Sequence, residues 1–278
     1  MALTIAKTNQ ELAAWQPSGR VALVPTMGAL HAGHMALVAE AKRRADQVMV
    51  YIFVNPAQFG PTEDFSHYPR TWEADVEKCR AAGADAIYAP TVEDVYPPGF
   101  STSISVKGPS EGLESDFRPG HFDGVATVLT TMFIRIAPHI AVFGEKDYQQ
   151  LMVVKKLVKD LAMPIEIIGV PTLREGDGLA MSSRNAYLST HERVIAAQLY
   201  ATLNETAAAL RQQIPPAQAL AAAQQKILAA GFAKVDYIAL ADAETLRPLA
   251  QLNRPARLLV AAWLGTTRLI DNLPVEPL

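Results

Sequence analysis

The sequence predicts an α/β protein with a doubly wound parallel sheet, Rossmann-like in class, followed by a second, smaller α+β domain. As far as residue 171, strand-like runs of Val, Ile and Ala alternate with segments of helical period. These runs are continuously apolar, which is the pattern of strands covered on both faces by helices. With 278 residues, half of them hydrophobic, the chain is long enough to bury a substantial core.

The elements of the expected first domain, residues 1–171, follow one another in strict alternation. Strands are expected at 20–25, 48–55, 84–90, 140–145 and 165–171, and helices at 33–46, 71–83, 121–138 and 147–161. Alternation of this kind is typical of βαβ units that join into one parallel sheet.

The pattern changes after Pro171, and residues 172–278 are expected to form the second domain. A polar, glycine-containing stretch at 172–189 precedes two alanine-rich helices, expected at 190–213 and 216–230. Apolar runs at 235–242 and 256–273 then predict an antiparallel hairpin that turns near the sequence GTT.

Composition excludes several classes of partner. A net charge of −3, with 25 basic against 28 acidic residues, gives no electrostatic footprint for nucleic acid. Cys79 is the single cysteine, so no intrachain disulfide is possible. The first residues lack the basic start and apolar run of a secretory signal, and the most apolar strand, VMVYIFV, is too short to span a bilayer. We therefore expect a cytoplasmic protein without nucleic-acid or membrane partners.

The string PTMGALHAGH, residues 25–34, stands where the first strand gives way to a helix. Ligands of open parallel sheets collect beyond the carboxyl ends of the strands, and the N-terminus of the next helix offers unpaired N–H groups. Gly28 and Gly33 allow close approach to the backbone, and His31 and His34 can face the same side of the helix start. A strand-to-helix turn needs glycine in any case, and a lone histidine is commonly a surface residue. The complete string favours a polyphosphate site.

HAGH is similar to the H-x-G-H signature of the nucleotidyltransferase superfamily, and the longer string resembles that of its pantothenate synthetase family. The resemblance extends through VNPAQF at 54–59, RPGHFDGV at 118–125, FGEKDYQQ at 143–150 and GLAMSSRNAYLS at 178–189. H-x-G-H alone is short and moderately specific, whereas five blocks in the order of the family are highly specific.

The resemblance implies an ATP-dependent condensation of pantoate with β-alanine to give pantothenate. Pantoate would attack the α-phosphorus of ATP and release pyrophosphate, and β-alanine would then displace AMP from the pantoyl adenylate. The triphosphate chemistry implies Mg²⁺, for which the sequence shows no dedicated ligands. The family is commonly dimeric, which implies a homodimer, and its C-terminal domain covers the active site.

For ATP, the resemblance implies contacts along both strand-end turns and along the MSSR loop between the domains. His31, His34, Lys146 and Arg184 are the implied catalytic residues, with His34 as the donor to the leaving group and Arg184 on a flap that closes over the triphosphate. Taken alone, Asp147 could be an N-terminal helix cap and MSSR an ordinary polar loop. The implied ATP-binding residues are Met27, Gly28, Ala29, Leu30, His31, Ala32, Gly33, His34, Gly144, Glu145, Lys146, Asp147, Leu173, Met181, Ser182, Ser183 and Arg184.

For pantoate and β-alanine, the resemblance implies neutral amides that orient the acid without quenching its nucleophilic carboxylate. Met27 and Phe59 would form an apolar wall for the geminal methyl groups. Without that context, the glutamines could be surface residues and Arg118 could anchor a loop through an ion pair. The implied substrate-binding residues are Gln58, Gln150, Asn55, Tyr68 and Arg118.

Two other functions remain open from the residues alone. Another H-x-G-H nucleotidyltransferase would use the same fold but would want more cations for a phosphorylated acceptor, and Gln58 and Gln150 argue against it. A non-catalytic nucleotide-binding module would need neither paired histidines nor a closing loop. Release of pyrophosphate distinguishes an enzyme from such a module.

Overall fold

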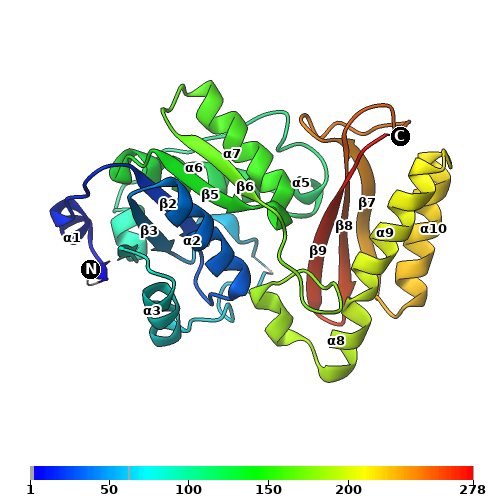
Figure 1. The fold of residues 1–278 in the computed structure, drawn as a ribbon, viewed down its shortest axis with the longest axis horizontal. Coiled ribbons are helices and arrows are strands. Elements are labelled where there is room, and N and C mark those ends of the chain that lie inside the picture. The colour runs from blue at the N-terminus through cyan, green and yellow to red at the C-terminus, as the bar shows by residue number, and fades with distance from the viewer. Residues whose placement is uncertain (1–2, 62, 278) are drawn as a thin grey trace. The chain divides into compact units, whose positions relative to one another are not determined.

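The computed structural model describes residues 3–61 and 63–277 and divides into two units, each built from three segments (Figure 1). The first unit comprises Met1–Lys107, Arg118–Glu145 and Val153–Pro171. The second comprises Gly108–Phe117, Lys146–Met152 and Thr172–Leu278. Two segments from within the expected first domain therefore group with the second unit.

Within the described residues, the first unit holds a sheet of six parallel strands. A parallel sheet is confirmed, and five of its six strands are those that the sequence predicts. The strands lie in the order β1-β4-β3-β2-β5-β6, and every neighbouring pair is parallel. Their bounds are β1 (Thr4–Ala6), β2 (Val21–Thr26), β3 (Gln47–Ile52), β4 (Ala86–Tyr88), β5 (Ile140–Gly144) and β6 (Glu166–Val170). The helical segments of this unit are α1 (Asn9–Ala14), α2 (Ala32–Arg44), η1 (Pro56–Gln58), α3 (Trp72–Ala81), α4 (Val92–Val95), α6 (His121–Ile136) and most of α7 (Tyr148–Asp160).

Both faces of the sheet are buried. Val24 of β2 and Val50 of β3 belong to one core cluster with Leu37 of α2. Leu23 of β2 points to the opposite face, because side chains alternate along a strand, and it is also fully buried. This arrangement explains why the strands appear in the sequence as continuous apolar runs.

The N-terminal elements β1 and α1 are absent from the sequence-based expectation. β1 has only three residues, of which Ala6 alone is buried, so it carries no apolar run of strand length. It pairs in parallel with β4 at the edge of the sheet. α1 begins with a capping box between Thr8 and Glu11.

The described part of the second unit contains a three-stranded antiparallel sheet and a set of helices. The sheet order is β7-β8-β9. The bounds are α5 (Glu114–Phe117), η3 (Ser183–Tyr187), α8 (Thr190–Ala196), α9 (Gln198–Arg211), α10 (Pro216–Ala229), β7 (Lys234–Asp242), β8 (Ala256–Leu264) and β9 (Thr267–Val275). The turn η2 (Glu145–Asp147) joins β5 to α7.

The C-terminal hairpin and the first alanine-rich helix differ in how well the sequence predicts them. The hairpin is confirmed, because β8 and β9 pair antiparallel across a two-residue turn at Gly265 and Thr266. The helix expected at 190–213 is wrong as a single element, because α8 ends at Ala196 and α9 begins at Gln198. No glycine or proline marks this break, so the composition gives no sign of it.

A buried carboxylate holds the turn between β2 and α2. Gly28 and Ala29 both have positive φ, 81° and 49°, so the chain here adopts a left-handed conformation that is costly for alanine. Asp75 of α3, only 1% exposed, accepts the N–H of Ala29 at 2.9 Å and that of Leu30 at 2.8 Å. The hydroxyl of Thr71 donates to the same carboxylate at 3.1 Å. These three hydrogen bonds offset the strain of the turn.

Asp75→Asn is expected to lower the free energy of unfolding by about 2–3 kcal/mol, because an amide nitrogen would face a backbone N–H inside the core. Urea denaturation followed by circular dichroism measures the change. Glu73→Gln on the exposed side of the same helix is the matched control and should lie within about 0.5 kcal/mol of the parent. Equal stability of the two variants would show that Asp75 does not hold the turn.

Candidate active site

The sheet order creates a switch point between β2 and β5. The chain runs from β2 outward to β3 and β4, and then returns through α6 to place β5 on the other side of β2. Ligands of open α/β sheets bind at the carboxyl ends of the strands beside such a point. The two strand-end motifs found in the sequence, which contain His31 after β2 and Gly144 at the end of β5, therefore follow adjacent strands.

His31 and His34 cap α2 reciprocally. The Nδ1 of His31 accepts the N–H of Gly33 at 3.1 Å, and the Nδ1 of His34 accepts the N–H of His31 at 3.2 Å. This is a capping box in which imidazoles replace the usual hydroxyl and carboxylate. The two rings lie with their centroids 4.1 Å apart and their planes tilted by 44°.

These caps determine where each imidazole carries its proton. Because each Nδ1 uses its lone pair to accept a backbone N–H, the neutral ring holds its proton on Nε2. Two Nε2–H donors thus stand at the N-terminus of α2, where the helix dipole also favours negative charge. Such an arrangement can stabilise phosphate oxygens.

Two of the predicted substrate residues meet on the turn after β3. The side-chain nitrogen of Gln58 in η1 lies 3.4 Å from the sulfur of Met27. Asn55, which is 1% exposed, donates to the side-chain oxygen of Gln58 at 3.1 Å. The structure therefore brings Met27, Asn55 and Gln58 together within the first unit.

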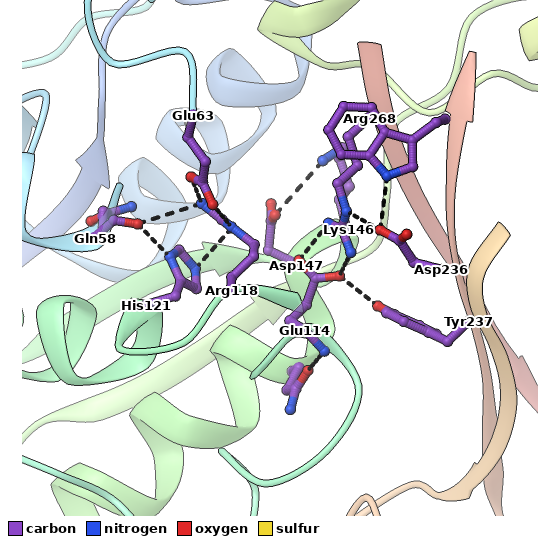
Figure 2. A network of polar contacts seen from close by, with 12 residues as sticks. Gln58, Glu63, Glu114, Arg118, His121, Lys146, Asp147, Asp236, Tyr237 and Arg268 are labelled. Carbon is purple, nitrogen blue, oxygen red and sulfur yellow. Dashed lines mark hydrogen bonds and ion pairs between the residues drawn. The ribbon is translucent and has the colours of Figure 1, made fainter. Parts of the chain in front are cut away.

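Arg118 is held by an ion pair and a histidine (Figure 2). Its Nε and Nη2 donate to the two carboxylate oxygens of Glu63 at 2.8 and 2.7 Å. His121 has its Nδ1 2.8 Å from the carbonyl oxygen of Gln58. A carbonyl only accepts, so this Nδ1 carries the proton and Nε2 can accept from Arg118 at 3.1 Å. The cluster supports the backbone of Gln58.

Aromatic rings surround the predicted apolar wall. The rings of Phe59 and Tyr68 meet edge to face with centroids 5.9 Å apart, and Phe65 packs on the other side of Phe59 at 5.3 Å. Tyr68 is 6% exposed. Phe59 and Tyr68, both predicted to line the substrate pocket, therefore form one packed group.

The remaining predicted residues belong to the second unit, apart from Gly144 and Glu145. Gln58 and Gln150, predicted to bind the same substrate, thus lie in different units. The carbonyl of Lys146 accepts from Asn272 of β9 at 2.8 Å, and its ammonium lies 3.7 Å from the carboxylate of Asp147. Gln150 lies in the first turn of α7 beside Gln149, whose buried amide donates to the carbonyl of Pro109 at 3.0 Å.

The MSSR segment is linked by backbone bonds to the segment after Pro171. The N–H of Met181 donates to the carbonyl of Leu173 at 3.0 Å, so these two predicted ATP-binding residues are adjacent. Ser182 caps η3, because its hydroxyl accepts the N–H of Arg184 at 3.2 Å. Ser183 and Arg184 form the first turn of η3.

A buried charged network in the second unit was missed by the sequence reasoning (Figure 2). Glu114 accepts both terminal nitrogens of Arg268, at 2.8 and 2.9 Å, and the hydroxyl of Tyr237 at 2.7 Å. Burial, together with the Glu114 carboxylate, raises the pKa of Tyr237 well above its ordinary value, so the hydroxyl stays a donor. Arg268 also donates to Asp236 at 2.8 Å. The network anchors the segment Gly108–Phe117 to β7 and β9.

Charged residues inside otherwise apolar strands were the one available signal for this network. Asp236 and Arg268 interrupt the runs that predict β7 and β9. Asp75 offered no signal, because it resembles the other acidic residues of a helix with an exposed polar face. Over the described residues, no helix is long and apolar enough to cross a membrane, and no group of three or more His, Cys, Asp or Glu side chains could hold a metal ion.

Comparison with known proteins extends the similarity over the whole chain. Residues 1–274 match the family model described as pantoate-beta-alanine ligase. Pantothenate synthetase of Rhizorhabdus wittichii is 57% identical over 270 residues, covering 97% of this chain and 96% of that protein. The enzyme of Rhodospirillum rubrum is 54% identical, with 99% of both chains covered.

Solved structures agree with the fold. A crystal structure of pantothenate synthetase from Thermus thermophilus matches with a TM-score of 0.94 and 47% identity, covering 99% of this chain and 100% of that one. Pantoate-beta-alanine ligase from Francisella tularensis, solved in complex with beta-gamma ATP and beta-alanine, matches with a TM-score of 0.83 and 34% identity, covering 98% and 97%. The chain belongs to the pantoate-beta-alanine ligase family.

Proposed function

We propose that this protein condenses pantoate with β-alanine at the expense of ATP, through a pantoyl adenylate. The observation that carries the proposal is the reciprocal histidine cap at the start of α2, which commits each Nδ1 to a backbone N–H and so leaves the ring proton on Nε2. Family membership and the Francisella ligase complex with beta-gamma ATP and beta-alanine support the choice of substrates.

The chemistry proceeds in two displacements. A carboxylate oxygen of pantoate attacks the α-phosphorus, and the bond to pyrophosphate breaks. The amine of β-alanine then attacks the acyl carbon of the adenylate, loses a proton and expels AMP. Neither step needs a nucleophile from the protein, whose tasks are to position the reactants, stabilise charge and exclude water.

Charge stabilisation falls to the histidines and two cations. His31 and His34 donate to phosphate oxygens, and His34 donates to the departing pyrophosphate. Lys146 contacts phosphate oxygens, and Arg184 reaches the β- and γ-phosphates when the MSSR loop closes. The rest of the nucleotide contacts come from the backbone of residues 27–34, from residues 144–147, and from Leu173, Met181, Ser182 and Ser183.

Pantoate is oriented by neutral amides. Gln58 and Gln150 hold its oxygens, Gln58 also borders the β-alanine site, and Met27 and Phe59 contact its methyl groups. Tyr68 and Arg118 complete this pocket, and Asn55 contributes to it through its hydrogen bond to Gln58. The contacts of Gln58 with Met27 and Asn55 support this assignment.

We propose that Mg²⁺ binds together with ATP as its counter-ion. Because Mg²⁺ commonly binds through substrate phosphates and water, no dedicated protein cage is required. We further propose a cytoplasmic homodimer in which residues 1–171 bind nucleotide and pantoate and residues 172–278 cover the active site.

The identity of the phosphorus attacked can be tested with isotope. Oxygen-18 in the pantoate carboxylate should appear in AMP, with pyrophosphate as the coproduct, because the attacking oxygen stays on the α-phosphorus when β-alanine cleaves the acyl bond. Mass spectrometry of the nucleotide products measures the transfer. ADP and orthophosphate would indicate an acyl phosphate, and absence of pyrophosphate release would favour a non-catalytic nucleotide-binding module.

His34→Ala is expected to lower kcat by about 10²-fold or more with a smaller change in KM for ATP, because its hydrogen bond strengthens as charge moves onto pyrophosphate. His34→Gln is the matched variant, since glutamine at this position can keep the capping box. It should retain the melting temperature while kcat stays low. A His34→Gln enzyme at the parental rate would show that His34 acts only as a helix cap.

Arg184→Ala should slow adenylate formation while leaving β-alanine attack on supplied pantoyl adenylate much less affected, because the β- and γ-phosphates are present only in the first step. Arg184→Lys should recover part of the rate, since lysine keeps the charge but loses the planar fork. Single-turnover measurements of each half-reaction give the two rates to be compared. Arg193→Ala, which removes a surface ion pair with Asp177, is the control. Equal slowing of both steps would contradict the closing flap.

A further inference from the structure

Asn55 is a buried amide whose four hydrogen-bonding positions are all used. Its nitrogen donates to the carbonyl of Gly124 at 3.2 Å and to the side-chain oxygen of Gln58 at 3.1 Å. Its oxygen accepts the N–H of Ala57 at 3.2 Å and the hydroxyl of Tyr96 at 2.7 Å. An amide offers two donors and two acceptor lone pairs, so nothing is left over.

The direction of the Asn55 amide is fixed by two main-chain groups. The carbonyl of Gly124 can only accept and the N–H of Ala57 can only donate, so nitrogen must face Gly124 and oxygen must face Ala57. If the amide were flipped, its nitrogen would face the N–H of Ala57 and its oxygen would face the carbonyl of Gly124, and neither pair can form a hydrogen bond. The second N–H of Asn55 is therefore committed to Gln58.

The orientation of the Gln58 side-chain amide is set by its hydrogen bond with Asn55. Because its side-chain oxygen accepts from Asn55, its NH₂ group points the other way, toward the sulfur of Met27 at 3.4 Å. A thioether is a weak acceptor. The turn thus presents an N–H donor, suited to a carboxylate or hydroxyl oxygen, rather than a carbonyl.

Tyr96, 41 residues after Asn55 in the chain, donates to Asn55 and completes this series of hydrogen bonds, called here the Tyr96–Asn55–Gln58 relay. It follows α4, and its ring packs edge to face on Phe100 with centroids 5.1 Å apart and tilted against Phe53 at 6.4 Å. Burial raises the pKa of Tyr96 to about 12, although the Asn55 hydrogen bond acts in the opposite direction. The phenol therefore stays protonated and donates near neutral pH.

We propose that Tyr96 is a positioning residue that acts through Asn55 to hold the amide of Gln58 with its NH₂ group toward the acid substrate. The donor so presented selects an oxyanion or hydroxyl oxygen at that place. This inference rests on the proposed binding of pantoate at Gln58, and it adds a residue from a segment that none of the sequence motifs includes.

Steady-state kinetics of Tyr96→Phe test the relay. The variant should raise KM for pantoate about fivefold, the usual effect of one lost hydrogen bond, while KM for ATP and kcat change less than about twofold. Tyr88→Phe is the matched control, because its hydroxyl is similarly tied, to Asn9 at 2.6 Å, but not to Asn55. Equal KM values for pantoate in the two variants would overturn the proposal.

A double-mutant cycle separates positioning from general support of the fold. If Tyr96 acts through Gln58, adding Tyr96→Phe to Gln58→Ala should leave the affinity for pantoate unchanged from that of Gln58→Ala alone. Binding is measured by calorimetry with pantoate and a non-hydrolysable ATP analogue. Effects that multiply in the double variant would show that Tyr96 acts by another route.

Gln58→Glu tests the direction of the amide. Asn55 can still donate to one carboxylate oxygen, so the other would face the acid substrate and should weaken pantoate binding on the order of 10²-fold at pH 8. Retained affinity would show that Gln58 presents its oxygen and would overturn the proposal. An unaltered parent that releases no pyrophosphate with pantoate and β-alanine would instead refute the proposed function, so the two failures are distinguishable.

Discussion

The parallel pairing of β5 with β2 is the constraint on which the first unit depends. To reach that position the chain must cross the sheet through α6, and this crossover brings Gly124 against the turn that carries Gln58. A Cβ on Gly124 would lie 2.3 Å from the carbonyl oxygen of Ala57, so only glycine permits the approach. The same topology places two helix starts beside one switch point. Strand order therefore determines where both the histidine-containing turn after β2 and the turn that carries Gln58 lie.

The sequence predicted the buried strands well because burial on both faces leaves an unmistakable composition. Residues of β2 and β5 are apolar at consecutive positions, and their segments were located almost to the residue. β1 was not predicted, since three residues carry too little pattern, and its place depends on pairing with β4. The break at Ala197 was also missed, because alanine is the strongest helix former and its presence predicts a continuous helix. The elements that the sequence did not predict are those that depend on tertiary packing.

The residues of the candidate site divide in the same way into those that local sequence predicts and those that it does not. His31 and His34 were singled out because they lie with glycines in a short string that follows a strand, and Asn55 and Gln58 through the resemblance to the family. Asp75, Tyr96 and Glu63 were not predicted, since each acts through long-range hydrogen bonds or an ion pair and is ordinary in its local sequence. Local sequence identified candidate ligand-binding groups, whereas the groups that hold them become visible only in three dimensions.

The histidine caps have a consequence for the charge balance of the site. Each imidazole commits its Nδ1 lone pair to a backbone N–H, so it keeps its cap only while neutral. While it is capped in this way, the pair offers directed N–H dipoles but no net positive charge. Neutralising the charge of a bound polyanion would then depend on other cationic groups. Folding and electrostatics are coupled through two nitrogen atoms: gaining a proton there would add charge at the cost of the first turn of α2.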